Sequence, residues 1–408
     1  MRITASFLND EPLRRLLAVL NQNGEEARVV GGAVRNALLD LPPGDVDLAT
    51  TERPERVMQR VAAAGLRPIP TGIEHGTVTV MVEGHSFEVT TLREDVATDG
   101  RHAVVAFGRD FVRDALRRDF TINALSCNAD GEIFDYTGGL DDLQARRVRF
   151  IGDALTRIRE DYLRILRFFR FHATYGEGPL DRAGFDAAIA ARHGLAQLSK
   201  ERIRVELLKL LATDRCLPVL RECNKAGFLN LILAGIAQPL RVAWLIARGD
   251  ADALLRLGAL AVQVREDAER LRHVLRLSNA ETQRLAFAAD VLAKLHGAER
   301  PPSPTALRRL HFAHGRQAVL DGFDLAFAES TGPVEDWARA RDYLAHLTSR
   351  TVPFGGADVM AQGLSGRAVG EALQKAQGMW VDADFPEDPA TLHALLQQAV
   401  ATTRGGAH

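Results

Sequence analysis

The sequence has few cysteines, few aromatic residues and no long apolar run, and each scarcity argues against a class of protein. The three cysteines, Cys127, Cys216 and Cys223, have no spacing typical of a metal site or a disulfide framework. We interpret them as buried thiols in a reducing compartment. No stretch approaches the roughly 20 apolar residues that span a membrane, and residues 1–11 lack the apolar run of a signal peptide. These observations predict a cytoplasmic protein without membrane association.

The chain also lacks an excess of positive charge, since 51 Lys and Arg residues face 53 Asp and Glu residues. A protein with this balance that binds a polyanion has to gather its cations locally. Composition alone therefore weighs against nucleic-acid binding. Aromatic residues make up 6% of the chain and hydrophobic residues 46%, and Leu, Ala and Arg are abundant. This composition favours a mainly helical protein with some sheet, and 408 residues suffice for about two to four domains.

Hydrophobic patterning divides the chain into an α/β part and a helical part near residue 140. Strands are predicted at 28–30, 46–49, 77–82, 86–91 and 133–136, and helices at 11–23, at 33–40 and after Pro54. Residues 93–113 are polar and charged, which predicts a mobile loop with little structure of its own. Beyond residue 140 helical periodicity dominates, with breaks at 175–179, 297–304 and 353–356.

A glycine turn followed by two acids is the first pattern with chemical content. Gly31 and Gly32 lie between a predicted strand and a helix start, where free backbone N–H groups form a site for an anion such as a triphosphate. Arg35 adds a charge one turn further on. Asp45 and Asp47 are two apart on a predicted strand, so both carboxylates point to one face and suit Mg²⁺. Each pattern alone is usually a plain turn or two exposed acids, but their order within one α/β unit is more specific.

Glu88 is the candidate for a third carboxylate. It lies mid-strand in Phe87–Thr91, between apolar neighbours, and its strand is expected beside the one that carries Asp45 and Asp47. An outward-facing strand acid is an equal alternative.

Arginines next to an acid form the second pattern, Arg117-Arg118-Asp119, which is followed at a short distance by Asn123. Arginines clamp phosphates bidentately, and a carboxylate accepts a hydrogen bond from a ribose hydroxyl. Without its neighbours in sequence, such a triplet is mostly a solvated surface cluster.

The third pattern lies within Arg159–Arg167. On a helix, Glu160 and Arg164 are separated by four residues and Asp161 and Arg164 by three, so all three share a face. The alternative interpretation, favoured without context, is a surface ladder of salt bridges.

Taken together, the ordered motifs Gly-Gly-x-Val-Arg, Asp-x-Asp, Arg-Arg-Asp and Glu-Asp-x-x-Arg resemble those of the class II tRNA nucleotidyltransferase and bacterial poly(A) polymerase family. The resemblance continues through 138–142 and 199–206, is dense over 28–211, and is looser at 275–279 and 355–370. One departure is Asn36, where the family usually has Asp, which removes the charge for a salt bridge. The His-Asp pair of an attached phosphohydrolase domain is absent, so that activity is not expected.

The resemblance implies an α+β fold. A nucleotidyltransferase head at 1–138 precedes an all-helical neck at 139–212, body at 213–345 and tail at 346–408, in a seahorse-like shape. Asp45 and Asp47 would bind two Mg²⁺ ions, with Glu88 as the third catalytic acid. The 93–113 loop resembles a flexible loop that the family needs to switch to A addition. Helical surfaces of body and tail would contact RNA.

The resemblance also assigns the nucleotide-binding residues. Arg117 and Arg118 match triphosphate contacts, and Asp119 matches a ribose contact. Asp161 and Arg164 match the pair that reads the incoming base. The other residues assigned to nucleotide binding are Gly31, Gly32, Arg35, Asn123, Glu160, which supports the base-reading pair, and Arg167.

Donor and acceptor chemistry then predicts which nucleotides are accepted. Asp161 only accepts hydrogen bonds and Arg164 only donates them. Cytosine and adenine each offer an amino donor beside a ring-nitrogen acceptor, whereas uracil and guanine offer the reverse. The pair should therefore admit CTP and ATP and reject UTP and GTP.

The function implied is addition of C, C and A to the 3′ end of tRNA without a template. Alternatives are enzymes that add only A or only CC, a poly(A) polymerase, an antibiotic-modifying type of nucleotidyltransferase, and a non-catalytic RNA-binding protein on the same fold. Residues 71–77 contain no Arg or Lys, which argues against the poly(A) polymerase. The sequence leaves open whether the protein is a monomer or a homodimer.

Overall fold

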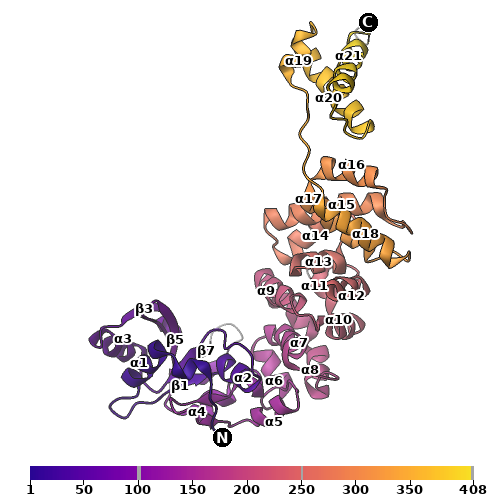
Figure 1. Cartoon of the computed structure of the whole chain (residues 1–408). Helices are drawn as coiled ribbons and strands as arrows, with labels where there is room; N and C mark the ends of the chain where they lie inside the picture. The colour runs from indigo at the N-terminus through magenta and orange to yellow at the C-terminus, as the bar shows by residue number, and fades with distance from the viewer. Residues whose placement is uncertain (99–102, 250, 406–408) are drawn as a thin grey trace. The chain divides into compact units, whose positions relative to one another are not determined.

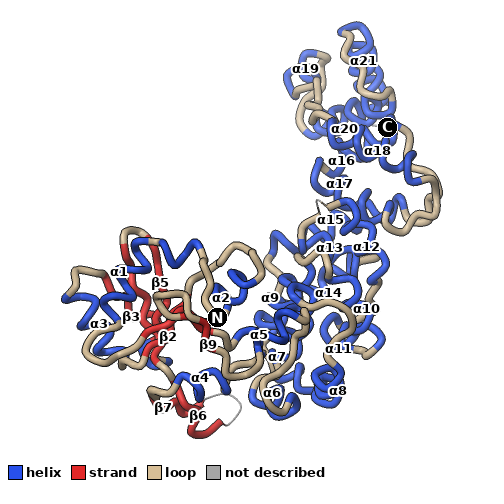
Figure 2. Tube along the Cα trace, turned by 60° about the horizontal axis from the view of Figure 1, so that its bottom comes forward, coloured by secondary structure: helices blue, strands red, loops and turns tan. Residues whose placement is uncertain are grey.

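The computed structural model describes residues 1–98, 103–249 and 251–405, which form two compact units, Met1–Ile232 and Leu233–His408 (Figure 1). The boundary between the units lies inside the predicted body. The finer division into head, neck, body and tail stays a prediction. Within the described residues all strands belong to the N-terminal unit, and the rest of the chain is helical (Figure 2). This agrees with the α+β class expected from the sequence.

A seven-stranded mixed sheet organises the first part of the N-terminal unit, with the strand order β3-β4-β5-β2-β1-β8-β9. The strands are β1 (Ala27–Val30), β2 (Asp47–Thr50), β3 (Arg67–Gly72), β4 (Thr77–Val82), β5 (His85–Thr91), β8 (Ser126–Cys127) and β9 (Ile133–Phe134). Strands β2 and β5 are parallel, with Leu48 opposite Val89, and the other neighbours are antiparallel. The parallel pair brings the segments that carry Asp47 and Glu88 side by side.

Strand β3 was not predicted from the sequence pattern. Its residues include Pro68 and Pro70, and proline removes a donor from the hydrogen-bonded ladder. Because β3 is an edge strand, one side of it makes no ladder bonds, and prolines are tolerated there.

Helices form the remainder of the N-terminal unit, and the last of them, α11, ends one residue beyond its boundary. They are α1 (Glu11–Leu20), α2 (Gly32–Leu38), α3 (Pro54–Ala63), α4 (Phe111–Leu116), α5 (Gly139–Gln144), α6 (Ala154–Glu160), α7 (Leu163–Tyr175), α8 (Arg182–Ala191), α9 (Lys200–Leu211), α10 (Cys216–Lys225) and α11 (Phe228–Leu233). Short 3-10 turns lie at Ser6–Asn9, Ile73–His75, Thr121–Asn123 and Arg192–Gln197. Leu13, Leu16, Leu17 and Leu20 of α1 are buried, as their helical spacing predicts.

The prediction of a loop with little structure at 93–113 was wrong for most of that segment. Strands β6 (Arg93–Thr98) and β7 (Ala103–Phe107) pair antiparallel, and α4 follows; residues 99–102 lie outside the described residues. The two strands form a separate two-stranded sheet. The available signal was Ala103–Phe107, an apolar run of strand length, which the charged residues on either side of it obscured.

A second correction concerns the helix expected through 159–167, which is broken. Helix α6 ends at Glu160, Asp161 is extended with φ −155° and ψ 108°, and α7 begins at Leu163. The Asp161 Oδ1 atom accepts the N–H of Leu163 at 3.0 Å. An aspartate that bonds a backbone N–H two residues ahead favours a turn over a continuous helix.

Aromatic packing fixes α7 against the sheet part of the unit. The ring of Phe120, next to the Arg-Arg-Asp motif, is fully buried and lies 5.3 Å from the ring of Phe171 on α7. It also lies 4.9 Å from the ring of Phe150. Such close aromatic pairs add to the apolar area that they bury, so the residues after Asp119 are held firmly against α7.

The C-terminal unit is all helical in its described part. Its helices are α12 (Pro239–Arg248), α13 (Ala253–Ala261), α14 (Arg265–Leu275), α15 (Asn279–Leu295), α16 (Pro304–His314), α17 (Arg316–Phe327), α18 (Val334–His346), α19 (Gly356–Ala361), α20 (Arg367–Asp382) and α21 (Pro389–Gly405). Trp337 is fully buried against Phe323 and Phe327, and a separate small core joins α19, α20 and α21. In the described residues no helix combines the length and apolarity needed to cross a membrane. The cytoplasmic location stays a prediction.

Candidate active site

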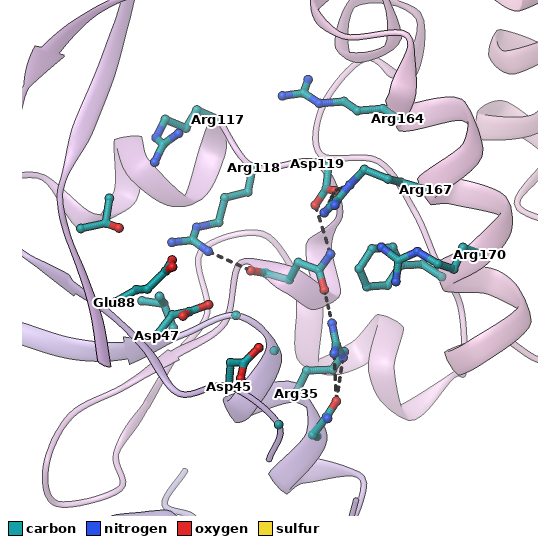
Figure 3. A pocket seen from close by; sticks show the side chains of 18 of the residues that line it. Arg35, Asp45, Asp47, Glu88, Arg117, Arg118, Asp119, Arg164, Arg167 and Arg170 are labelled. Atoms are coloured by element: carbon teal, nitrogen blue, oxygen red, sulfur yellow. Dashed lines mark hydrogen bonds and ion pairs between the residues drawn. The ribbon is translucent and has the colours of Figure 1, made fainter. Parts of the chain in front are cut away.

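One pocket of about 770 Å³ brings together nearly all site residues that the sequence predicted (Figure 3). Predicted residues that line it are Gly31, Gly32, Arg35, Asp45, Asp47, Glu88, Arg117, Arg118, Asp119, Asn123, Asp161, Arg164 and Arg167. Glu160 does not line the pocket but bonds Arg164, which does. The pocket also contains Arg93, Arg170 and Arg202, which the sequence analysis did not single out. The lining therefore carries more arginines than acids, in a chain whose overall charge is nearly balanced.

Three carboxylates form the acidic side of the pocket. Asp47 begins β2, Glu88 lies on the neighbouring strand β5, and Asp45 lies in the bend just before β2 rather than on the strand as expected. Burial raises the pKa of Asp47 to about 6, and the negative charges of Glu88 and Asp45 act in the same direction, against the charge of Arg118. Asp47 is therefore close enough to Asp45 and Glu88 for both charges to act on it, and Figure 3 shows the three side chains on the same side of the pocket.

The acidic side suits a divalent cation in its chemistry. Among the residues that the structure describes, no three His, Cys, Asp or Glu side chains form a ready-made metal cage. Asp45 and Asp47 instead offer two hard oxygen ligands in an open pocket, and their mutual repulsion favours a positive charge between them. Mg²⁺ is usually held by one or two carboxylates together with substrate phosphates and water. The residues present therefore fit such an ion.

Arg117 and Arg118 are held by an acid that the sequence analysis missed. Asp114 on α4 accepts bonds from Arg117 at 2.6 Å and from Arg118 at 3.0 Å. Burial alone would raise the pKa of Asp114, but the two guanidinium charges and their hydrogen bonds hold it below its usual value. In the sequence, the only indication of these pairs was that Asp114 precedes Arg117 by three residues and Arg118 by four, which places the side chains on one face of a helix. Asp114 thus fixes both arginines at the rim of the pocket.

A chain of hydrogen bonds crosses the pocket floor (Figure 3). The Arg35 Nη1 atom donates to Asn123 Oδ1 at 2.5 Å, Asn123 Nδ2 donates to Asp119 Oδ1 at 3.1 Å, and Arg167 Nε donates to Asp119 Oδ2 at 2.7 Å. Burial pushes the pKa of Asp119 upward, but the charge of Arg167 and the hydrogen bonds to Asn123, Arg167 and the Phe120 N–H hold it below its usual value. Asp119 is therefore a fixed, ionised acceptor.

Arg35 is anchored inside the protein more than the sequence suggested. Its guanidinium also donates to the Tyr175 hydroxyl at 2.6 Å and twice to Asn36 Oδ1, at 2.9 and 3.2 Å. Burial lowers its pKa. The departure at Asn36 therefore keeps the contact with Arg35, and its amide adds a bond to the carbonyl of Pro42 at 2.8 Å, which an ionised Asp could not donate.

In the glycine turn, Gly31 contributes its backbone shape to the pocket and not a free N–H group. Gly31 has φ +69°, which few side-chain-bearing residues adopt, and a Cβ there would meet Arg118 Nη1 at 3.4 Å. Its N–H donates to the carbonyl of Leu125 at 2.9 Å, so it is not free for an anion. The turn thus allows close approach of Arg118 to the backbone.

The opposite side of the pocket comes from α7 and α9. Arg164 donates to the Glu160 carboxylate and, at 2.8 Å, to the carbonyl of Arg157. Arg170, which the sequence analysis missed, donates to Glu206 at 2.6 Å. The guanidinium groups of Arg164, Arg167 and Arg170 lie on the same side of the pocket, as Figure 3 shows. This wall faces the acidic side that carries Asp47.

A mixed sheet with carboxylates at one end of an arginine-lined pocket is an arrangement suited to a nucleotidyltransferase. Comparison with known proteins agrees. The family model described as "Poly A polymerase head domain" matches residues 27–149, and the one described as "Probable RNA and SrmB- binding site of polymerase A" matches residues 181–238.

Relatives extend the likeness over nearly the whole chain. The mitochondrial CCA tRNA nucleotidyltransferase 1 of Danio rerio is 34% identical over 94% of this chain and 90% of its own length. The Homo sapiens protein of the same name is 46% identical over 49% of this chain and 47% of its own length. A crystal structure of the Bacillus stearothermophilus CCA-adding enzyme in complex with CTP is 27% identical, has a TM-score of 0.75, and covers 97% of this chain and 98% of that one.

The chain belongs to the tRNA nucleotidyltransferase and poly(A) polymerase family, to which these CCA-adding enzymes also belong. Enzymes of this family generally use divalent metal ions.

Proposed function

We propose that the protein adds C, C and A to the 3′ end of tRNA, from CTP and ATP and without a template. The observation that carries the proposal is the single pocket in which a carboxylate cluster, an arginine cluster and the Asp161–Arg164 segment meet. Support comes from the Danio rerio relative, which is named a CCA tRNA nucleotidyltransferase and whose similarity covers most of this chain.

The reaction joins an RNA 3′-oxygen to the α-phosphorus of a nucleotide and breaks the bond to pyrophosphate. Asp45 and Asp47, with Glu88 beside them, would hold two Mg²⁺ ions, and the chemistry supplied by these ions would be Lewis acidity toward the attacking hydroxyl and the leaving pyrophosphate. The protein's own part is then positioning and electrostatics. Arg117 and Arg118 bind the triphosphate from a rim fixed by Asp114.

Asp119 binds the ribose of the nucleotide, and Asn123 and Arg167 orient Asp119. The bonds from Asn123 and Arg167 fix its carboxylate, and its ionised state provides an acceptor for a ribose hydroxyl. Arg35 completes this chain from α2. Because these groups are fixed before substrate arrives, the nucleotide loses its freedom without reorganising the site.

Base selection is assigned to Asp161 and Arg164. Both line the pocket on the side opposite the acidic cluster, with Glu160 bonded to Arg164. Asp161 accepts the amino group of cytosine or adenine, and Arg164 donates to the neighbouring ring nitrogen. Uracil and guanine would leave both groups unpaired, at about 1–3 kcal/mol for each group.

A poly(A) polymerase is the second candidate, since the matching head-domain model carries that description. The segment 71–77, which spans the end of β3 and the start of β4, contains no Arg or Lys and does not support it. The tRNA partner, the monomeric or dimeric state and the identity of the metal as Mg²⁺ belong to the same proposal.

Substrate choice tests the proposal. Purified protein with Mg²⁺ and labelled CTP or ATP is offered three RNAs: tRNA ending at the discriminator base, tRNA ending in CC, and an unrelated RNA of similar length. We expect extension of both tRNAs and none of the unrelated RNA. Extension of only the CC-ended tRNA would indicate an A-adding enzyme, and a long A tail on the unrelated RNA would indicate a poly(A) polymerase.

A further inference from the structure

Helix α9 contributes one guanidinium to the pocket, that of Arg202. Its Nη2 atom donates to Asp161 Oδ2 at 2.7 Å, across 41 residues of sequence. Arg202 lies in the 199–206 segment, which resembles a family motif but in which the sequence analysis assigned this residue no role. The residue it touches is the one assigned to reading the amino group of the base.

Asp161 needs outside support because of its local structure. It lies in extended conformation between α6 and α7, so no helix backbone fixes its side chain. Its side chain is 34% exposed. Two contacts orient the carboxylate: the Leu163 N–H bonds Oδ1 at 3.0 Å, and Arg202 bonds Oδ2 at 2.7 Å. The first contact fixes one oxygen, and the second sets the rotation of the carboxylate plane.

The other base-reading residue has its own, separate anchor. Arg164 is fixed by Glu160 and by the carbonyl of Arg157, and Arg157 itself donates to Glu160 at 3.0 Å. Glu160 thus does for Arg164 what Arg202 does for Asp161. Selection between bases depends on the relative orientation of both groups, so each anchor contributes to it.

From this geometry we infer that Arg202 is a specificity-determining positioning residue, which holds Asp161 so that it accepts the amino group of cytosine or adenine. The inference rests on the proposed function and names a further determinant of its base selection. Each carboxylate oxygen has more than one acceptor direction, so the bond from Arg202 leaves room for the base. Without Arg202, Asp161 can rotate away, and the pocket loses its penalty against the carbonyl of uracil or guanine.

Arg202→Gln is therefore expected to change selection more than overall turnover. The ratio of kcat/KM for CTP over UTP, and for ATP over GTP, should fall about 10-fold, which corresponds to about 1.4 kcal/mol. Arg202→Lys retains a charged donor and should recover most of the ratio. Lys209→Gln is the matched control, since Lys209 is an exposed cation on the same helix outside the pocket, and it should leave the ratio unchanged.

A double-mutant cycle shows whether Arg202 acts through Asp161. The four nucleotides are measured on CC-ended tRNA and on tRNA ending at the discriminator base, with the wild type, Arg202→Gln, Asp161→Ala and the double variant. We expect the double variant to select no worse than Asp161→Ala alone. Unchanged selection in Arg202→Gln, equal loss with all four nucleotides, or additive losses in the double variant would overturn the inference. Failure of the wild type to extend tRNA would instead refute the proposed function.

Discussion

Asp47→Asn is expected to lower nucleotidyl transfer by about 10³-fold or more while making the metal-free protein more stable at pH 8. The loss follows because Asp47 is one of the two carboxylates proposed to hold the metal ions, whose stabilisation of the transition state amounts to several kcal/mol. The gain follows because the pKa of Asp47 is raised to about 6 by burial and by the charges of Glu88 and Asp45. An ionised Asp47 therefore opposes folding.

The pH dependence of that gain has a defined sign. A carboxyl group whose pKa is raised by folding stabilises the folded state below its unfolded value of 3.8, and this contribution is lost as the pH rises through about 6. The amide of Asn does not ionise, so the stability of the variant does not fall in this way as the pH rises. In EDTA, Asp47→Asn should match the wild type near pH 3.5 and exceed it by about 1–2 kcal/mol at pH 8, allowing for partial solvent screening.

Chemical denaturation at several pH values, beside initial rates with CTP, measures both effects. Asp130→Asn is the control, because Asp130 is exposed, lies outside the pocket and belongs to none of the motifs. It should change neither activity nor the stability profile. An Asp47→Asn protein that transfers nucleotides at near wild-type rates, or that is destabilised at pH 8, would contradict the assignment of the acidic cluster.

Asp161→Ala is expected to lower the preference for CTP over UTP by about 10–100-fold. The physical reason is the removal of an acceptor that uracil would leave unpaired, a penalty of about 1–3 kcal/mol. Because Asp161 is partly exposed and lies between two helices, truncating it should leave the fold intact. Single-nucleotide incorporation with CTP and UTP on tRNA lacking CCA gives the ratio directly.

Asp161→Asn distinguishes the loss of the acceptor from the introduction of a hydrogen-bond donor at the same position. An amide can turn its donor toward the carbonyl of uracil, so this variant should use UTP better than Asp161→Ala does. The matched control is Asp186→Asn, an exposed aspartate on α8 that pairs with Arg182 away from the pocket. If Asp161→Ala retained wild-type preference, base reading by this residue would be refuted.

The residues that the sequence could identify are those grouped in short motifs. Gly31, Gly32, Asp45 and Asp47 lie within 17 residues of one another, and strand and helix periodicity place them in one α/β unit. The prediction of Glu88 required only the further expectation that its strand lies beside the strand that carries Asp47. The β2–β5 ladder confirms this position. Their catalytic roles stay predictions.

The residues that the sequence missed depend on tertiary packing. Arg202 meets Asp161 only because α9 packs against α7, and Tyr175 meets Arg35 across 140 residues. Arginine and tyrosine are common residue types, and no nearby residue in the sequence indicates these contacts. Asp114 differs, because its spacing to Arg117 and Arg118 was visible in the sequence but was typical of any surface helix.

The break between α6 and α7 shows how a local preference prevails over periodicity. The hydrophobic spacing through 158–169 fits one helix, yet the bond from Leu163 N–H to Asp161 stabilises a turn there. As a result Asp161 and Arg164 both line the pocket but have different partners, since Asp161 bonds Arg202 and Arg164 bonds Glu160. They do not form a row of salt bridges along one helix.

The sequence of the added nucleotides tests the central claim most directly. The purified protein is incubated with Mg²⁺, all four nucleoside triphosphates and a tRNA that ends at the discriminator base, and the 3′ ends of the products are sequenced. We predict that C, C and A are added in that order and that addition then stops, although UTP and GTP are present. Tails of repeated A, incorporation of U or G at the frequency of C, or no extension would contradict the account.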